Sequence, residues 1–280
     1  MFEAHMLDAQ VFRKIFEAAK ELLEDASFDC TSEGLSLQAM DAIHVSLVSL
    51  ELRAEGFELY RCDRATNMGF KVAGLLKILK CAGNKDSLTM RAEDQPDKCS
   101  FIFESPNKDK ISQFDFALTD IDQEHLQVPD QEYFVNIKMP SAEFSRICRD
   151  LANFGDTVTI SCTKGQVQFA ANGDLGTANI RLQESSSIDD DESDRVQIDV
   201  GEPLTLSFAV RYLNNFAKAQ VLSDSVTLML TPKTPMVVEY KIGDYGHIRF
   251  YLAPKIDDEE EDDATSQPTT QALKDEDDDE

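Results

Sequence analysis

The sequence lacks closely spaced cysteines and clustered histidines. Its six cysteines, at positions 30, 62, 81, 99, 148 and 162, form no CxxC motif, and its four histidines are scattered. Structural zinc sites and disulfide frameworks depend on such spacing, so we expect no metal, no cofactor and no disulfide. This cysteine usage favours a reducing compartment, the cytosol or the nucleus.

Long apolar runs and catalytic patterns are also missing. No run is long enough to cross a bilayer, and the first residues do not resemble a signal peptide. No Ser-His-Asp, paired-carboxylate, metal-ligand or phosphate-loop pattern stands where a pocket could organise it. We therefore expect a protein that is not an enzyme and has no catalytic residue.

Positive charge is scarce, with 27 Lys and Arg against 53 Asp and Glu, a formal net charge of −26. The last segment, 257–280, carries thirteen acids and one lysine, a net −12, which leaves −14 for the rest. This tail has no apolar periodicity and is predicted to be disordered. Charges separated by much more than about 8 Å are largely screened at physiological salt, so a basic face elsewhere remains compatible with this composition.

What the sequence does contain is a weak copy of itself. Residues near 12–50 align with those near 144–182 at a constant offset of 132. After an acidic expansion near 184–195 the offset becomes 138, and residues 86–90 align with 224–228. The aligned pairs include Phe12 with Phe144, Cys30 with Cys162, Leu50 with Leu182 and Lys80 with Lys218. A repeat of this length is a domain, so the chain is predicted to be two similar domains in tandem.

The length of 280 residues suits two domains that each bury a core. Most segments alternate apolar and polar residues as strands do, and four segments, about 9–23, 71–81, 141–153 and 210–219, have helical periodicity. Ser141 follows Pro140 and is predicted to be an N-cap. The sequence therefore predicts an α+β class, with two helices per domain on one face of antiparallel sheets. The expected parts are residues 1–117, a connector 118–134, residues 135–256 and the tail 257–280.

Basic residues recur on all four predicted helices of this acidic chain. They could form ordinary solvated faces with intrahelical ion pairs. They could also form a surface for phosphates that is salt-sensitive and independent of base sequence. No aromatic residues interleave with them, which favours duplex over single-stranded DNA. The residues are Arg13, Lys14, Lys20, Lys77, Lys80, Arg146, Arg149, Arg211 and Lys218.

Several motifs resemble one known family. They include Lys77-Ile-Leu-Lys-Cys-Ala-Gly83, Arg146-Ile-Cys-Arg-Asp-Leu151 and Tyr251-Leu-Ala-Pro-Lys-Ile256, and the likeness extends over about residues 1–256. The chain resembles the eukaryotic sliding clamp, the proliferating cell nuclear antigen family. The resemblance implies a DNA-clamp fold and a head-to-tail homotrimer, a six-domain ring whose helices face duplex DNA through the nine basic residues above.

The resemblance also implies a pocket for partner peptides beside the connector. Val45 and Leu47 could instead simply close the core. The implied pocket residues are Met40, His44, Val45, Leu47, Leu126, Val128, Pro129, Pro235, Tyr251, Ala253, Pro254 and Ile256. The implied subunit seam joins strands near 109–117 and 175–183, with Phe114 and Ile111 packed against Leu175, Ala178 and Ile180. Lys164 matches the family's site for ubiquitin-type modification.

By the same resemblance, the expected role is that of a nuclear processivity factor. After a clamp loader places it on DNA, it would tether replicative DNA polymerases, a flap endonuclease and DNA ligase. It would also take part in translesion synthesis. Two alternatives remain open. The chain could be one subunit of a heterotrimeric checkpoint-type clamp, or its acidic tail could make it a chaperone of basic proteins.

Overall fold

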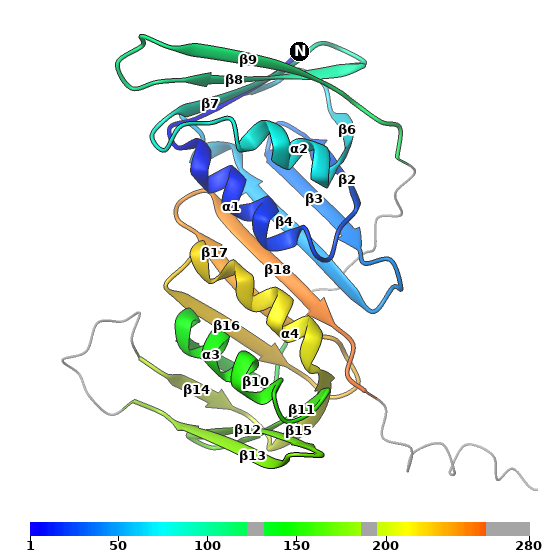
Figure 1. The fold of residues 1–280 in the computed structure, drawn as a ribbon, viewed down its shortest axis with the longest axis vertical. Helices are drawn as coiled ribbons and strands as arrows, with labels where there is room; N and C mark the ends of the chain where they lie inside the picture. The colour runs from blue at the N-terminus through cyan, green and yellow to red at the C-terminus, as the bar shows by residue number, and fades with distance from the viewer. Residues whose placement is uncertain (122–131, 186–194, 256–280) are drawn as a thin grey trace, which may run out of the picture.

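The computed structural model describes residues 1–121, 132–185 and 195–255. The two halves lie one above the other along the long axis, and four helices cover one face of the sheets (Figure 1). This is the predicted α+β plan of two tandem domains. No helix of the described residues is long and apolar enough to cross a membrane.

The N-terminal half forms five strands of one sheet, in the order β5-β1-β7-β8-β9, and contributes β4-β3-β2-β6 to a second sheet. Its elements are β1 (Phe2–Met6), α1 (Ala9–Ala19), β2 (Asp25–Cys30), β3 (Gly34–Met40), β4 (Ser46–Arg53), the 3-10 turn η1 (Ala54–Gly56), β5 (Leu59–Cys62), β6 (Thr66–Lys71), α2 (Val72–Leu79), β7 (Ser87–Ala92), β8 (Lys98–Glu104) and β9 (Ile111–Ala117).

The C-terminal half repeats this plan, with the order β14-β10-β16-β17-β18 in one sheet and β13-β12-β11-β15 in another. Its elements are β10 (Val135–Pro140), α3 (Ser141–Leu151), β11 (Thr157–Thr163), β12 (Gln166–Gly173), β13 (Gly176–Gln183), β14 (Gln197–Val200), β15 (Leu204–Ala209), α4 (Val210–Phe216), the 3-10 turn η3 (Ala217–Val221), β16 (Ser225–Leu230), β17 (Met236–Ile242) and β18 (Gly246–Leu252).

The two halves are joined by a strand pair as well as by the connector. β18 pairs antiparallel with β4, so that Phe250 lies opposite Val48 and Ile248 opposite Leu50. This pairing makes one nine-stranded sheet that runs through both domains. The domains therefore share a continuous hydrogen-bonded sheet, and their buried apolar side chains, apart from Leu47, Val237 and Tyr251, belong to one large hydrophobic cluster.

The register of the strands corrects one predicted alignment. Leu37 and Phe169 are equivalent in the two copies, and they lie opposite Leu50 and Ile180. Leu50 therefore corresponds to Ile180, not to Leu182. The prediction was wrong because the hairpins differ in length, and a slip of two residues keeps the same side chains facing the core.

The four predicted helices are confirmed, and each ends two to four residues earlier than expected. Asp8 caps α1 by accepting a 2.8 Å hydrogen bond from the N–H of Gln10. The prediction that Ser141 is an N-cap was wrong, because extended Pro140 occupies that position. Ser141 is the first helical residue, and its hydroxyl donates to the carbonyl oxygen of Ser223. Cys30 and Cys162 are small buried core residues, as their equivalence in the repeat predicted.

Candidate functional site

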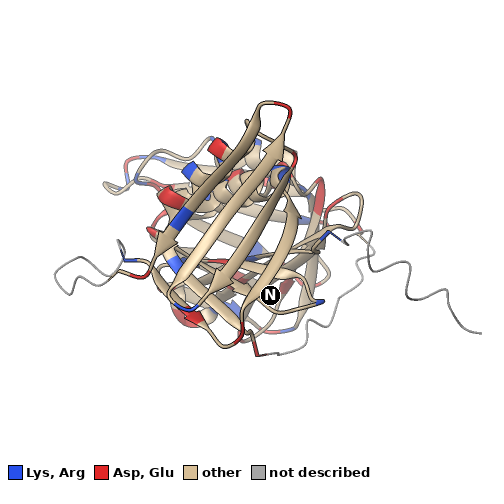
Figure 2. Cartoon of the chain, turned by 90° about the horizontal axis from the view of Figure 1, so that it is seen from below, with Lys and Arg blue, Asp and Glu red and all other residues tan. Residues whose placement is uncertain are grey.

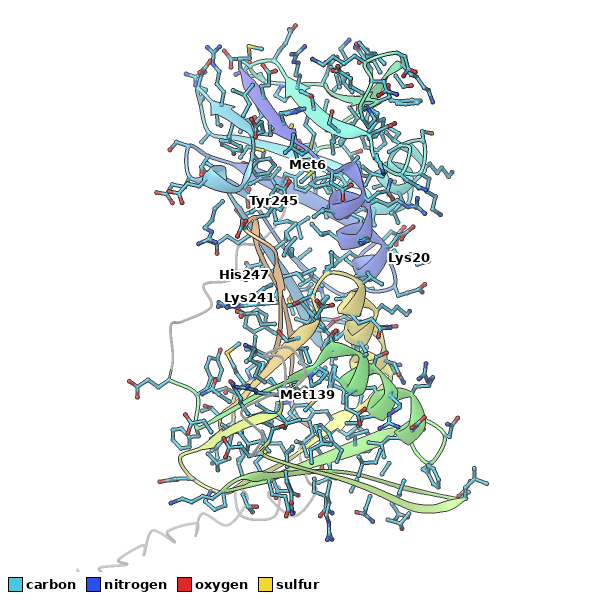
Figure 3. The ribbon with its side chains drawn as sticks, turned by 90° about the vertical axis from the view of Figure 1, so that its left-hand side faces the viewer. Met6, Lys20, Met139, Lys241, Tyr245 and His247 are labelled. Atoms are coloured by element: carbon cyan, nitrogen blue, oxygen red, sulfur yellow. The ribbon has the colours of Figure 1, made fainter. Side chains whose placement is uncertain are left out.

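One face of the molecule is formed by helices, and it carries the nine basic residues that the sequence predicted on them. Of the nine, eight side chains are exposed and Arg13 is half-buried. Each helix buries its apolar stripe, for example Phe12, Ile15 and Phe16 of α1, and so turns its remaining side chains outward. In Figure 3, Lys20 lies on the opposite side of the sheet from Lys241 and His247. We call this helical side the inner face.

Ion pairs neutralise part of the inner face. Arg13 pairs with Glu17 at 2.9 Å, and Arg146 pairs with Glu143 at 2.7 Å. Glu21 lies within 4 Å of both Lys20 (3.8 Å) and Lys218 (3.9 Å), and so it connects the two domains. Of the nine basic residues, five have no ion pair with another described residue: Lys14, Lys77, Lys80, Arg149 and Arg211. Exposed pairs are weak, so both the paired and the free cations remain able to meet an anion.

The opposite side of the nine-stranded sheet, the outer face, carries a single row of apolar side chains. Five residues lie opposite one another in register on five adjacent strands, β16, β17, β18, β4 and β3. Leu47, Val237 and Tyr251 are buried, and they pack with partly buried neighbours that include Tyr133. The five residues, called the apolar row below, are Met229, Val237, Tyr251, Leu47 and Met40.

The neighbouring rows of the same face are polar. Glu239, Arg249 and Ser49 lie opposite one another two residues further along, and Arg249 donates a 2.7 Å hydrogen bond to Glu239. The next row contains Lys241 and His247. Because only one row is apolar, it forms a bounded apolar site across the junction of the two domains.

Three predicted pocket residues, Met40, Leu47 and Tyr251, thus lie in the apolar row, whereas Val45 packs against the main core. His44, Pro235 and Ala253 are exposed around it, and Pro254 is half-buried. Leu126, Val128, Pro129 and Ile256 lie outside the described residues. Sequence reasoning missed Val237 and Met229. The run Met236-Val237-Val238 held the signal, because a strand that is polar on one face does not need three apolar residues in succession.

A loop of β3–β4 borders the row and is fixed by one carboxylate. Oδ1 of Asp41 accepts hydrogen bonds from the N–H groups of Val45 (2.8 Å) and Ser46 (2.6 Å), and Oδ2 accepts one from the hydroxyl of Tyr212 (2.8 Å). Burial opposes ionisation of Asp41, but these hydrogen bonds outweigh it and lower its pKa. The loop at the outer face is therefore tied to α4 of the inner face.

The strands expected at a subunit seam are both sheet edges. β9 ends the five-stranded sheet and β13 ends the four-stranded sheet. Phe114, Ala178 and Ile180 are half-buried and pack against the core, whereas Ile111 and Leu175 are 64% and 78% exposed. Ile111 is three residues from Phe114, so the two predicted seam residues lie on opposite faces of β9. Arg181 is the only charged residue on the four strands of the lower sheet, nearest the viewer in Figure 2.

Comparison with protein families decides what this arrangement is. Residues 1–126 match the family described as proliferating cell nuclear antigen, N-terminal domain, and residues 127–255 match its C-terminal domain. The chain belongs to the proliferating cell nuclear antigen family. Its two halves are the two clamp domains of that family, in the expected order.

Members of the proliferating cell nuclear antigen family are DNA sliding clamps without enzymatic activity, and this chain has their fold. The family match indicates the general functions that the inner face and the sheet edges have in a clamp. A clamp binds DNA, assembles into a ring and receives other proteins. Lys164 lies exposed in the turn between β11 and β12, next to Gly165 with a φ of 71°.

Proposed function

We propose that this protein is a homotrimeric ring that encircles duplex DNA and serves as the processivity factor of replicative DNA polymerases. The nine basic residues of the inner face meet DNA phosphates, without reading bases. The ring retains the DNA by enclosing it, so each contact can be weak and the ring can slide.

The observation that carries the proposal is the internal β18–β4 junction. Met90 and Leu228 are equivalent in the repeat. Two strands further across the sheet, Phe114 is in register with Met90, and Phe250 is in register with Leu228. Phe114 is therefore the counterpart of Phe250. Likewise, Ala178 and Ile180 occupy the places of Val48 and Leu50. The edges β9 and β13 are therefore the counterparts of two strands that already pair within the chain.

Repeating the internal register between subunits gives a specific seam. Phe114 of one subunit lies opposite Ala178 of the next, and Ser112 lies opposite Ile180. Such pairing satisfies two edges that would otherwise stay open to uncontrolled association. A head-to-tail contact of this kind closes into a ring, and the internal junction fixes the rotation between successive domains.

The apolar row serves, in this proposal, as the docking site for partner peptides. Tyr251, Leu47 and Val237 have polar counterparts at the seam: Asp115, Thr177 and Ser100 respectively. Asp115 there accepts hydrogen bonds from Ser100 (2.6 Å) and Gln113 (3.1 Å). A ring of three chains would thus present three apolar sites, one per chain, each suited to a short helix with aliphatic and aromatic anchors.

We extend the proposal to the partner proteins and the cellular compartment. The apolar site would receive replicative polymerases, flap endonuclease, DNA ligase and the clamp loader, in the nucleus. Exposed Lys164 is the proposed acceptor of ubiquitin-type modification for translesion synthesis. Replacement of Lys164 by Arg, with mass analysis of the modified protein, tests that assignment.

The first test of the proposal is the mass in solution, measured by light-scattering chromatography. We expect three chains for the parent and one chain for the double variant Phe114→Asp/Ile180→Asp, because two carboxylates would be buried at the seam. An Arg181→Ala variant, changed on the other face of β13, is the matched control and should remain trimeric. A monomeric parent would overturn the homotrimer and leave the subunit of a heterotrimeric clamp as the better hypothesis.

A further inference from the structure

We propose that the acidic tail, residues 257–280, docks on the inner face of its own ring and competes there with DNA. The proposal rests on the proposed DNA-binding function of that face and adds a means of regulating it. It assigns one occupant to the free cations of α3 and α4, a segment of the same chain.

The first argument is where the described chain ends. After β18, the N–H of Lys255 donates a 2.7 Å hydrogen bond to the carbonyl oxygen of Ser207, at the edge strand β15. The Nζ of Lys255 also donates to the hydroxyl of Thr157 in β11. The repeat contains the same contact, because the N–H of Thr119 donates to the carbonyl oxygen of Gly69. Lys255, the last described residue before the tail, is thus held at β15 and β11.

The second argument is what lies next to this point. β15 continues directly into α4, and the N–H of Val210 donates a 3.0 Å hydrogen bond to the carbonyl oxygen of Asp156, just after α3. Arg211 in the first turn of α4 and Arg149 in the last turn of α3 are both exposed. Figure 1 shows the end of β18 beside the N-terminal end of α4. The tail therefore begins close to two cations of the inner face.

The third argument is charge. The tail has thirteen carboxylates and one ammonium group, and residues 257–263 are seven acids in succession. Within the described residues, Arg149 and Arg211 lack an ion-pair partner, and Lys77 and Lys80 of α2 also lack one. A dense negative segment tethered beside unpaired cations meets them at an effective concentration of about millimolar.

The tail is also long enough to reach the cations of α3 and α4. A flexible chain of 24 residues has a root-mean-square span of about 27 Å. The helix α3 of 11 residues is about 16 Å long. The tail can therefore cover the cations of α3 and α4 without detaching at Lys255, and DNA has to displace it.

The experiment compares the full chain with a chain ending at residue 256, using anisotropy of a short fluorescein-labelled duplex. Loss of the tail should tighten DNA binding about tenfold at about 50 mM salt, since the phosphates no longer compete with carboxylates. The difference should vanish near 1 M salt, where the screening length falls to about 3 Å.

A matched pair of variants separates docking from net charge. In one, the six acids 257–262 become their amides; in the other, the six acids of 184–194 become amides. The end of β13 and the start of β14, which flank the second segment, lie across the lower domain from the end of β18 (Figure 1). Docking predicts tighter DNA binding for the first variant alone. Equal gains in both variants would show a general charge effect and overturn the proposal.

Carbodiimide cross-linking with mass analysis locates the tail in the full chain. We expect links from tail carboxylates to Lys77, Lys80 or Lys218, lost when duplex DNA is added. Links confined to Lys233 and Lys241 would place the tail elsewhere and overturn the proposal. Equal DNA affinity of the full and shortened chains also overturns it while leaving the clamp function intact, whereas absence of DNA binding by both chains would mean that the proposed DNA face itself fails.

Discussion

The hydroxyl of Tyr212 donates a 2.8 Å hydrogen bond to Oδ2 of Asp41, which joins an inner helix to the loop beside the apolar row. Tyr212 is 5% exposed and follows Arg211, whose guanidinium carbon lies 5.0 Å from the centre of the Tyr212 ring. Within the described chain, this hydrogen bond is a direct link between the face proposed to meet DNA and the site proposed to meet proteins.

Removing that hydroxyl should destabilise the protein. Tyr212→Phe deprives a buried carboxylate of one donor, which costs about 2 kcal/mol. We expect a lower midpoint of chemical denaturation with an unchanged slope, measured at fixed protein concentration. The matched control is Tyr240→Phe, because the Tyr240 hydroxyl is buried with no hydrogen-bond partner among the described residues. That variant should be neutral or more stable, and an equal loss in both would mean that the Asp41 contact contributes nothing.

The lowered pKa of Asp41 predicts a stability that depends on pH. Because the native pKa lies below the unfolded value of about 3.9, the carboxylate contributes stability above that value. The contribution is lost as pH falls through the native pKa. Unfolding free energies of the parent and Asp41→Asn should therefore differ most above about pH 5, and the difference should shrink as the pH falls below about 4. A difference that stays constant over this range would contradict the assignment.

Much of the fold can be predicted from the sequence. Apolar periodicity is visible within a single segment, and the internal repeat is visible when the two halves of the chain are compared. The helices, the predominance of strands and the tandem plan were predicted this way. The equivalence of Leu50 with Leu182 was wrong, since sequence does not reveal a two-residue slip that preserves alternation. Ser141 was predicted to be the N-cap of α3, but Pro140 occupies that position.

The sites were less accessible to sequence, for a related reason. The basic helix faces could be read from spacing within one helix. The apolar row could not, because Met229 and Val237 become neighbours of Tyr251 only through the register of separate strands. Ile111 and Phe114 were assigned to one seam by the family resemblance, and the two-residue period of a strand puts them on opposite faces.

The apolar row should bind peptides through its whole length, including the end that sequence reasoning missed. Met229→Glu places a charge on a partly buried member of the row, and we expect at least about a tenfold loss of affinity for a helical peptide with aliphatic and aromatic anchors. Fluorescence titration measures this. Ser49→Glu, in the polar row beside Arg249, is the control and should bind like the parent. Equal affinity of Met229→Glu and the parent would confine the site to Val237, Tyr251, Leu47 and Met40.

The internal junction makes a prediction about the ring that is specific to single residues. If subunits repeat the β18–β4 register, Phe114→Cys and Ala178→Cys in one chain lie opposite each other across every seam, with Cβ atoms about 5 Å apart. Mild oxidation should then link the chains into a covalent trimer on a denaturing gel. Ile111→Cys with Ala178→Cys is the control, because these positions are three residues out of register on opposite faces. The parent, with its six native cysteines, sets the background. Efficient linking of the control pair but not of the first pair would mean that the seam uses a different register, and the ring would then not be an extension of the junction inside the chain.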